Sequence, residues 1–428
     1  MHVLADALGE LGRHPRALPW RIRLHARWGN VGNVREHVVF APALGRSVWP
    51  VLARAHNAAL LYNPAAVEIV APLSAVELEP FLASLREMHR IPVVLAPAPV
   101  VPMLLGDVPA VDEPPMQLCG EGLAVGLDIG GTGMKVIALD PGTHHVVASA
   151  AGPTWPAGEQ GITSLIVRSR ALVSAAAAGR TIGSLGIGLA APMGVGGRVL
   201  ELSTILRERV GDVGAFDGFA GKVALGLVDG PVAMFNDLSN LGRHLSANGA
   251  RRMVRLQIGT SFGGCWIDAD GAAVSTEMGR LVVDVSPDAI AHTYLPIRGA
   301  MRTYLSNVAV ARVLGDAMRT GVEPSRAGHA WAEALARRHP AAQVVVAHVS
   351  DALVGVVREL SALLVGLDVV ECGGSMLSGA AGKLVGERVA ARSPVPFRVS
   401  LRPGEDGAIA AALAPRLEAP LRGLLRVS

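Results

Sequence analysis

The sequence is poor in aromatic residues, in lysine and in cysteine. Phe, Trp and Tyr make up 4% of its 428 residues, so a core must be built mainly from Ala, Val, Leu and Ile. Lysine occurs only at Lys135, Lys222 and Lys383, and arginine supplies the remaining positive charge. The formal net charge of +3 is too small to indicate a nucleic-acid partner, and no dense arginine block is interleaved with aromatic residues.

The sequence also shows no segment with the pattern of a membrane span or of a signal peptide. No apolar run of about 18 residues lacks a charge, a proline or a polar break, so we expect no membrane span. Charges and histidines are scattered through Met1–Pro19, and the pattern there predicts no signal peptide. Cys119, Cys265 and Cys372 are widely spaced and form no metal-type pair, which indicates a reducing compartment, the cytoplasm.

A proline-dense stretch from Ala96 to Gly122 divides the chain, because this density of proline forbids a regular helix. We therefore expect an N-terminal α/β segment over residues 1–120, of unknown role, and two further lobes over 121–240 and 241–428. In the N-terminal segment the clearest pattern is a strand, a helix and a strand. They are expected over 66–71, 74–90 and 91–95. The first 60 residues give no clear signal.

After Gly122 the pattern alternates between strands and helices. We predict strands at 123–127, 134–139, 145–151, 184–189, 232–235, 254–258, 264–268, 369–371 and 396–401. We predict helices at 162–178, from 238 onward, and at 300–314, 325–338, 341–364, 380–391 and 406–414. Two units of strand, glycine-rich turn and strand, separated by strands and helices, predict two α/β lobes that face each other.

The first glycine-rich turn carries the residues of a phosphate site. A strand ends at Asp128, and Gly130 and Gly131 let the backbone turn tightly and approach a phosphate. Thr132 adds a hydroxyl donor, Lys135 adds a positive charge, and Asp128 can hold Mg²⁺ through water. A plain hairpin with a Gly-Gly turn is the alternative. The combination of residue types favours phosphate binding.

Two later segments repeat this composition in part. Their residues are Gly259, Thr260, Gly263 and Gly264 in the second segment, and Gly373, Gly374 and Ser375 in the third. Each alone is also compatible with an ordinary turn. The second segment gains weight from its pairing with the first, because two glycine-rich turns across a cleft can hold a triphosphate from both sides.

A short apolar strand presents Asn236 and Asp237 at its end, where a helix begins. Asp237 could be the N-cap of that helix. In a phosphoryl transfer it would accept the proton of the attacking hydroxyl, and the two phosphate turns favour this catalytic interpretation.

Together these four elements resemble the ASKHA superfamily of sugar kinases, actin and heat-shock chaperones, and within it the ROK family of bacterial sugar kinases and repressors. Ile187–Gly194 and Glu405–Ala408 are similar to further ROK segments. The resemblance runs from Gly122 to the C-terminus and implies a two-lobed actin/hexokinase-like, ribonuclease H-like fold. It implies ATP and Mg²⁺ as cofactors, a small-molecule sugar or polyol partner, and no nucleic-acid or membrane partner. It leaves room for a homodimer.

The resemblance also implies residue roles. Asp237 would be the general base, and Asn236 would help to hold the acceptor. The first two glycine segments would hold phosphates, and Gly373–Ser375 would lie near the adenosine.

The sequence departs from the ROK pattern on the acceptor side. ROK kinases usually carry Glu-x-Gly-His followed by a Cys-rich zinc motif. Here Glu277 remains, Arg280 replaces the histidine, no cysteine follows, and Arg302 stands where a glutamate is usual. We therefore predict no zinc, and an acceptor other than glucose that contacts Glu277, Arg280 and Arg302. The alternative is that the two arginines form ion pairs that staple the lobe.

Three functions remain in competition at this point. The favoured one is an ATP-dependent kinase acting on a hydroxyl of a sugar or sugar-like polyol, such as a cyclitol, an aminosugar or an already phosphorylated sugar. The alternative is a non-catalytic ROK-like protein that senses a ligand or regulates. ROK repressors place a winged helix-turn-helix first, and residues 1–120 do not show that spacing. The third is a bifunctional enzyme with a catalytic N-terminal segment.

Overall fold

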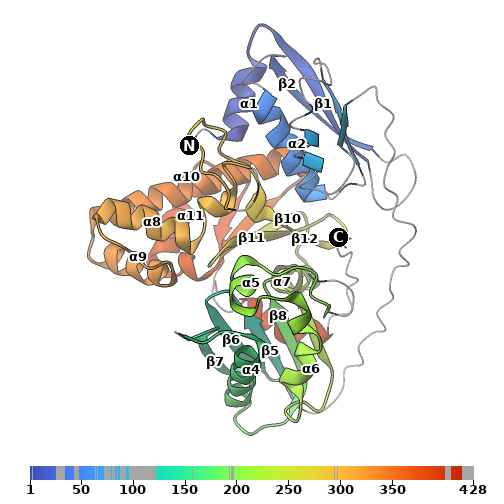
Figure 1. Ribbon diagram of the computed structural model, residues 1–428, viewed down its shortest axis with the longest axis vertical. Coiled ribbons are helices and arrows are strands. Elements are labelled where there is room, and N and C mark those ends of the chain that lie inside the picture. Colours follow the sequence, from blue (N-terminus) through green and yellow to red (C-terminus); the bar gives the residue numbers. More distant parts are fainter. Residues whose placement is uncertain are drawn as a thin grey trace.

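Three β-sheets organise the protein. The computed structural model describes residues 1, 3–25, 34–42, 48–62, 64, 66–71, 79, 82–83, 85–86, 93–95, 122–156, 158–191, 193, 197–293, 295, 297–400 and 406–416. In Figure 1 an N-terminal α/β unit, in blue, lies against a large lobe in yellow to orange, and a small lobe in green lies below them. The two-lobed α/β fold expected from the sequence is confirmed.

The small lobe is built on a sheet with strand order β7-β6-β5-β8-β9. Its strands are β5 (Leu123–Ile129), β6 (Gly133–Leu139), β7 (Val146–Pro153), β8 (Ile182–Leu189) and β9 (Val232–Asn236). Its helices are α4 (Ile162–Ala177), α5 (Thr204–Val210) and α6 (Phe219–Ala224). Strands β5, β6 and β7 pair antiparallel, whereas β5, β8 and β9 run parallel. Every residue of β8 is buried, as the continuous apolar run of that strand predicts.

The large lobe repeats this strand order as β12-β11-β10-β13-β14. Its strands are β10 (Met253–Ile258), β11 (Phe262–Ile267), β12 (Ala273–Thr276), β13 (Val369–Gly373) and β14 (Phe397–Val399). Its helices are α8 (Asn307–Met318), α9 (Ala327–Ala336), α10 (Pro340–Leu363) and α11 (Gly379–Ala390). Helix α7 (Asp237–Ala247) links the lobes, since it contacts β11 and β12 as well as the C-terminal helix α12. The two lobes therefore share not only a glycine turn but also the strand order of the whole sheet.

Helix α12 (Asp406–Leu413) returns to the small lobe and packs on β5, β6 and β8. The backbone of α12 comes very close to β5 and β8, because the facing residues of these strands are glycines. A Cβ atom on Gly126 would lie 2.0 Å from the carbonyl oxygen of Ala408, and one on Gly186 would lie 1.7 Å from that of Ala411. The small-lobe core therefore includes residues far beyond position 240.

The N-terminal unit is a sheet of order β2-β1-β3-β4 covered by two helices. Its elements are α1 (Leu4–Gly12), β1 (Ala17–His25), β2 (Val34–Pro42), α2 (Val48–Tyr62), β3 (Ala66–Val70) and β4 (Val93–Leu95). Strands β3 and β4 pair parallel, as predicted from the strand–helix–strand pattern. Residues 79, 82–83 and 85–86 are helical, and the rest of the predicted helix 74–90 lies outside the described residues. The buried side chains of this unit and of the large lobe form one continuous core.

The sequence-based assignments miss several elements. Four elements of the first 62 residues gave no signal, and α5, α6 and β12 were not predicted. The helix predicted over 300–314 is wrong at its start. Ser306 is extended, its hydroxyl caps the α8 N-terminus by accepting from the Ala309 N–H at 3.3 Å, and the helix runs on to Met318.

Helix α10 is long and apolar enough to cross a membrane by length and composition alone. However, 67% of its most apolar window is buried inside the protein. Figure 1 shows the helix running through the large lobe, beneath the N-terminal unit. Its apolar character is that of a core helix, as expected from the sequence.

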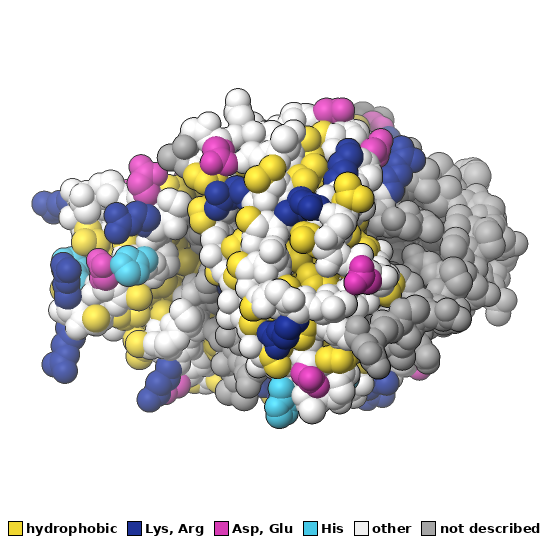
Figure 2. Space-filling model, turned by 90° about the horizontal axis from the view of Figure 1, so that it is seen from below, with side chains coloured by type: hydrophobic (Ala, Val, Ile, Leu, Met, Phe, Trp, Pro, Cys, Tyr) yellow, Lys and Arg dark blue, Asp and Glu magenta, His cyan; other side chains and the backbone are white. Residues whose placement is uncertain are grey.

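The described surface mixes both signs of charge. Figure 2 shows the underside of the molecule, where basic side chains stand among acidic and apolar ones. This arrangement agrees with the small net charge of +3.

We expect Gly186→Ala to lower the free energy of unfolding by about 1–3 kcal/mol, because the new methyl group would force α12 away from β8. Urea denaturation measures the change. Gly221→Ala in α6 is the matched control, since a Cβ there meets nothing within 4 Å, and it should leave stability equal or slightly raised. A Gly186→Ala variant as stable as the parent would contradict this account of the α12 contact.

Candidate functional site

Strand register brings Asp128 and Asp237 together. In the parallel ladder Asp128 lies opposite Gly188, and Gly188 lies opposite Phe235, two residues before Asp237. A Cβ atom on Gly188 would lie 3.7 Å from Asp128 Oδ1 and 3.8 Å from Asp237 Cβ. The two carboxylate side chains therefore flank Gly188 at the carboxyl end of the small-lobe sheet, where ligands of α/β sheets bind.

Removal from water raises the pKa of both acids. Burial raises the pKa of Asp128 to about 6, although the nearby Lys135 opposes the shift. Burial, followed by the charge of Asp128 and that of Glu277, raises the pKa of Asp237 to about 7, while the Leu238 N–H opposes the rise. A pKa near 7 is in the range that suits a general base at neutral pH.

Asn236, and not Asp237, is the N-cap of α7. Its Oδ1 accepts hydrogen bonds from the N–H groups of Leu238 and Ser239 at 3.1 and 2.9 Å, and its Nδ2 donates to the Ala191 carbonyl at 3.0 Å. The sequence alternative in which Asp237 caps the helix is therefore wrong. Asp237 is the first helical residue, and the cap fixes the turn that carries its carboxylate.

The first two glycine turns meet. The hydroxyls of Thr132 and Thr260 lie 3.0 Å apart, although 128 positions separate them in sequence. Gly130 closes the first turn by donating to the Gly133 carbonyl at 3.0 Å, and Gly259 closes the second by donating to Ser261 at 2.9 Å. The turn of each lobe thus faces its counterpart, as predicted.

Gly263 and Gly264 lie beyond the second turn, inside β11. A Cβ on Gly263 would lie 2.5 Å from Leu238 Cδ1, and one on Gly264 would lie 2.4 Å from Met278 Sδ. Close packing against protein side chains accounts for the absence of a Cβ at both positions, although Gly263 lies next to the second turn in the hairpin. Lys135 lies opposite Asp128 in the β5–β6 ladder.

The third glycine segment adjoins the second. Gly373 lies opposite Gln257 in the parallel β10–β13 ladder, and a Cβ on Gly374 would lie 1.9 Å from the Ile258 carbonyl. Gly374 has φ +103°, which favours glycine. Ser375 follows at the start of a short 3₁₀ helix and is exposed.

A buried ion pair that the sequence analysis did not assign lies below this segment. Arg255 is 1% exposed and donates through Nη1 to Glu371 Oε1, and Arg398 Nε donates to Glu371 Oε2 at 2.5 Å. A Cβ on Gly373 would lie 2.1 Å from Arg255 Nη2, so the arginine supports the third segment from below. Arg255 stands inside a largely apolar strand, and this feature of the sequence could have indicated the ion pair.

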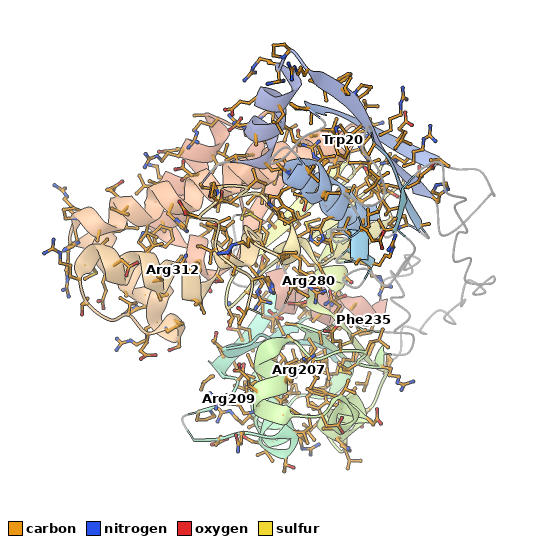
Figure 3. The ribbon with its side chains drawn as sticks, turned by 45° about the horizontal axis from the view of Figure 1, so that its top comes forward. Trp20, Arg207, Arg209, Phe235, Arg280 and Arg312 are labelled. Atoms are coloured by element: carbon orange, nitrogen blue, oxygen red, sulfur yellow. The ribbon has the colours of Figure 1, made fainter. Side chains whose placement is uncertain are left out.

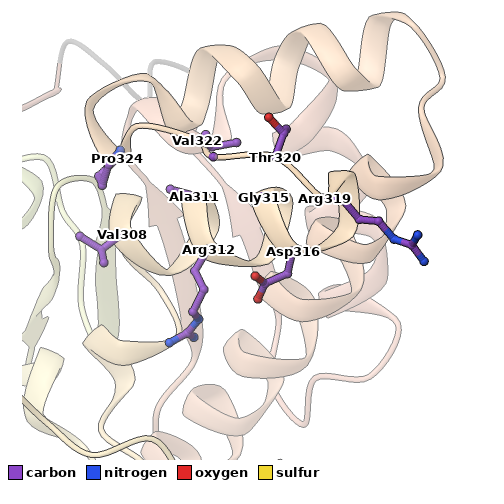
Figure 4. Close-up of a pocket in the computed structure, with 10 residues that line it drawn as sticks. Val308, Ala311, Arg312, Gly315, Asp316, Arg319, Thr320, Val322 and Pro324 are labelled. Carbon is purple, nitrogen blue, oxygen red and sulfur yellow. The ribbon is translucent and has the colours of Figure 1, made fainter.

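A cavity of about 670 Å³ follows one face of α8. Figure 4 shows Val308, Arg312 and Asp316 on successive turns of the helix, with Thr320 and Val322 on the loop that follows. Helix α8 begins beside the second glycine turn, because the Asn307 N–H donates to the Gly259 carbonyl at 2.9 Å. The cavity therefore begins on the element that adjoins the second glycine turn.

Glu277, Arg280 and Arg302 lie near one another. Arg280 Nε lies 3.5 Å from Glu277 Oε2, and a Cβ on Gly279 would lie 3.6 Å from Arg302 Cβ. Burial, followed by the charges of Arg302 and Arg280, lowers the pKa of His292 to about 4. The ion pair of Arg280 with Glu277 is compatible with the stapling alternative and does not exclude a contact with a ligand. Figure 3 shows Arg280 and Phe235 near the level where the lobes meet.

Asp284 is hydrogen-bonded to Tyr304. It is 3% exposed, accepts a hydrogen bond from the Tyr304 hydroxyl at 2.6 Å, and accepts another from the Ser286 N–H at 3.0 Å. The bond between Tyr304 and Asp284 joins the two ends of the segment from Asp284 to Tyr304.

Asp128 suits a hydrated magnesium ion, since it presents carboxylate oxygens at the mouth of the first turn and a hydrated Mg²⁺ needs few protein ligands. Among the described residues, no group of three or more His, Cys, Asp or Glu side chains could hold a metal by itself. Cys265 and Cys372 are free thiols in the core. The absence of zinc stays a prediction.

Comparisons with known proteins agree with this architecture. No family model and no curated protein sequence matches the chain. Among solved structures, it is similar to a ROK family glucokinase from Streptomyces griseus in complex with glucose and AMPPNP, with 19% identity, a TM-score of 0.54, and coverage of 69% of this chain and 99% of that one.

It is also similar to a ROK hexokinase from Thermus thermophilus, at 20% identity, TM-score 0.50 and coverage of 69% and 98%. A putative N-acetylmannosamine kinase from Listeria monocytogenes matches at 12% identity, TM-score 0.52 and coverage of 69% and 98%. Over the matched 69% of its length, the chain therefore has the fold of these ROK kinases. The resemblance drawn from the sequence is confirmed at the level of fold.

The raised pKa of Asp237 predicts a pH-dependent stability. A carboxyl group with a higher pKa in the folded chain than its ordinary value of about 4 stabilises the fold fully below that value. The contribution is lost as the pH rises through about 7. Asp237→Asn should therefore be more stable than the parent at pH 8, with the difference vanishing near pH 4. Chemical denaturation across this range measures it, and Asp288→Asn, at an exposed position, should show no such trend. A stability difference between Asp237→Asn and the parent that does not change with pH would contradict the raised pKa of Asp237.

Proposed function

We propose that this protein is a cytoplasmic ATP-dependent kinase that phosphorylates a hydroxyl of a sugar or sugar-like polyol. The observation that carries the proposal is Asp237, a half-buried acid whose pKa is raised to about 7 and which lies beside Asp128 at the carboxyl end of the small-lobe sheet. A protein that only binds a ligand has no need of a base adjusted in this way.

The nucleotide would lie along the three glycine segments. Its phosphates would lie against Gly130–Thr132 and Gly259–Thr260, two turns that are neighbours because their threonine hydroxyls lie 3.0 Å apart. The adenosine would lie toward Gly373–Ser375 and the cavity along α8, since both adjoin the second turn. A volume of about 670 Å³ is in the range of small-molecule sites.

In this mechanism Asp237 takes the proton of the acceptor hydroxyl. The hydroxyl oxygen forms a bond to the γ-phosphorus, the bond from that phosphorus to the β–γ bridging oxygen breaks, and ADP leaves. Thr132, Thr260 and Lys135 would position the phosphates. Mg²⁺, held through water by Asp128, would supply positive charge to the phosphate oxygens.

The acceptor side supports a ligand other than plain glucose. Arg280 and Arg302 are close enough to act on the same histidine, and one carboxylate, Glu277, pairs with Arg280. Guanidinium groups grip an anion bidentately. We therefore propose a cyclitol, an aminosugar or an already phosphorylated sugar, with Glu277, Arg302 and Asn236 on its side of the site.

A coupled assay of ADP release over a panel of neutral and anionic polyols tests the proposal. We expect turnover with at least one member, and a loss of about two or more orders of magnitude in Asp237→Asn with ATP affinity nearly unchanged. If no polyol of the panel supports ADP release, the result would favour the ligand-sensing alternative. Turnover by Asp237→Asn near that of the parent would remove Asp237 from the mechanism.

Gly259→Val tests the nucleotide site directly. A Cβ at this position meets nothing within 4 Å, so the protein itself has room for the side chain. We expect the melting temperature to stay the same while the affinity for ATP falls at least about tenfold, because the side chain would occupy the place of a phosphate. Calorimetric titration with an ATP analogue measures this. Unchanged affinity would show that the second turn does not hold the nucleotide.

A further inference from the structure

The role of the N-terminal unit can be argued from where it docks. Helix α2 contacts the short 3₁₀ helix η4 (Met278–Arg280), and it reaches the backbone that follows. Asn57 is fully buried, donates to the Val282 carbonyl at 2.7 Å and accepts from the Val282 N–H at 2.8 Å. A side-chain amide that pairs both ways with one peptide residue fixes the position and the direction of that backbone.

Neighbouring residues continue this contact in both directions. His56, 2% exposed, bonds through Nε2 to the Arg280 carbonyl at 3.0 Å. From α1, the Leu4 N–H donates to the Val283 carbonyl at 2.7 Å, and Val3 forms an antiparallel bridge with Asp284. The N-terminal unit thus bonds to residues 280, 282, 283 and 284 of one short segment.

The unit is itself anchored to the core helix α10. Asn57 Nδ2 also donates to Glu359 Oε1 at 3.0 Å, and Arg54 Nε lies 2.8 Å from the same oxygen. Glu359 has no exposed side-chain surface, and its pKa is raised by burial and lowered by Arg54. A buried carboxylate bonded by two groups of α2 fixes that helix against the large lobe.

The clamped segment leads directly to the acceptor side of the site. It begins after Glu277 and includes Arg280. Its other edge bonds to the short 3₁₀ helix η5 (Met301–Thr303) that carries Arg302, since the Met301 N–H donates to the Leu281 carbonyl at 2.8 Å. Glu277 acts electrostatically on Asp237. The N-terminal unit lies on one side of this segment, and the charged groups of the site belong to the same segment and its neighbour.

From this juxtaposition we propose that the N-terminal unit is a positioning element of the acceptor site, with His56 and Asn57 as its positioning residues. The inference deepens the proposed kinase function and rests on it for the acceptor. His56 and Asn57 touch neither acceptor nor nucleotide. They hold Arg280–Asp284, so that Glu277, Arg280 and Arg302 keep one arrangement for the ligand.

Three variants test the proposal in the full chain. Asn57→Ala removes the clamp on Val282, His56→Ala removes the bond to Arg280, and His56→Gln restores a side-chain N–H at that place. Arg358→Ala is the matched control. It breaks the Arg358–Asp6 ion pair of 2.7 Å between α10 and α1, in the same interface but without a bond to residues 280–284.

Hydrogen exchange of the peptide covering Met278–Asp284 reads the clamp without any substrate. We expect at least tenfold faster exchange in Asn57→Ala and His56→Ala, and parental exchange in Arg358→Ala and His56→Gln. Should exchange in Asn57→Ala and His56→Ala rise no more in this peptide than elsewhere, the unit would only stabilise the fold and the positioning proposal would be overturned.

Kinetics with the acceptor found in the polyol panel provide the second readout. His56→Ala should raise the acceptor KM at least tenfold while the Kd for ATP stays within twofold, and His56→Gln should recover most of the loss. An equal change in the acceptor KM and in the Kd for ATP would contradict a role confined to the acceptor side. Absence of turnover in the parent chain would overturn the kinase function instead, and the exchange experiment would still decide whether the clamp exists.

Discussion

The site depends on the register of three parallel strands and on one missing side chain. Strands β5, β8 and β9 place Gly188 between Asp128 and the residues that lead to Asp237. Any Cβ there would occupy the space beside both carboxylate side chains, which stand within 4 Å of it. Burial raises the pKa of both acids, and the charge of Asp128 adds to the rise at Asp237. The closeness of the two side chains on either side of Gly188 thus contributes to the raised pKa of Asp237.

The duplicated sheet explains why two distant turns can cooperate. In both lobes the central strand and its antiparallel neighbour are joined by a glycine turn, and the parallel strands lie on the far side. When the lobes face each other, equivalent turns meet, and the 3.0 Å contact of Thr132 with Thr260 is the result. The small lobe is closed from behind by α12, which approaches Gly126 and Gly186 closely and brings Gly407 to Asp128. The C-terminal helix therefore forms part of the wall around the carboxylates.

The sequence predicts this part of the protein well for a physical reason. Glycine turns between apolar strands have local signatures, so β5, β6, β10 and β11 and the turn residues could be found without tertiary information. Gly263 and Gly264 resemble turn glycines in sequence, yet Leu238 and Met278 pack where their side chains would be. Such packing depends on residues far away in the chain. The Asn236 cap was also ambiguous, because two adjacent residues could have filled that place.

The N-terminal unit was the least predictable region, and its interface shows why. Trp20, Ile22 and Leu24 alternate with Arg21, Arg23 and His25 in β1, and this alternation is a strand signal that the sequence analysis missed. The decisive contacts, from Asn57 to Val282 and from His56 to Arg280, span more than 220 positions.

The segment from Glu277 to Asp284 carries one arginine and two acids, and the solvent-accessible ion pair between Glu277 and Arg280 contributes little to holding its shape. Buried hydrogen bonds to its backbone can hold it, because breaking them would leave peptide groups unsatisfied away from water. Asp284 and Tyr304 close the segment at one end, and α2 fixes it from outside. Removing the N-terminal unit would therefore uncover the apolar core it shares with the large lobe and free the backbone of Arg280–Asp284 at once. The acceptor side of the site and the stability of the large lobe thus depend on the same interface.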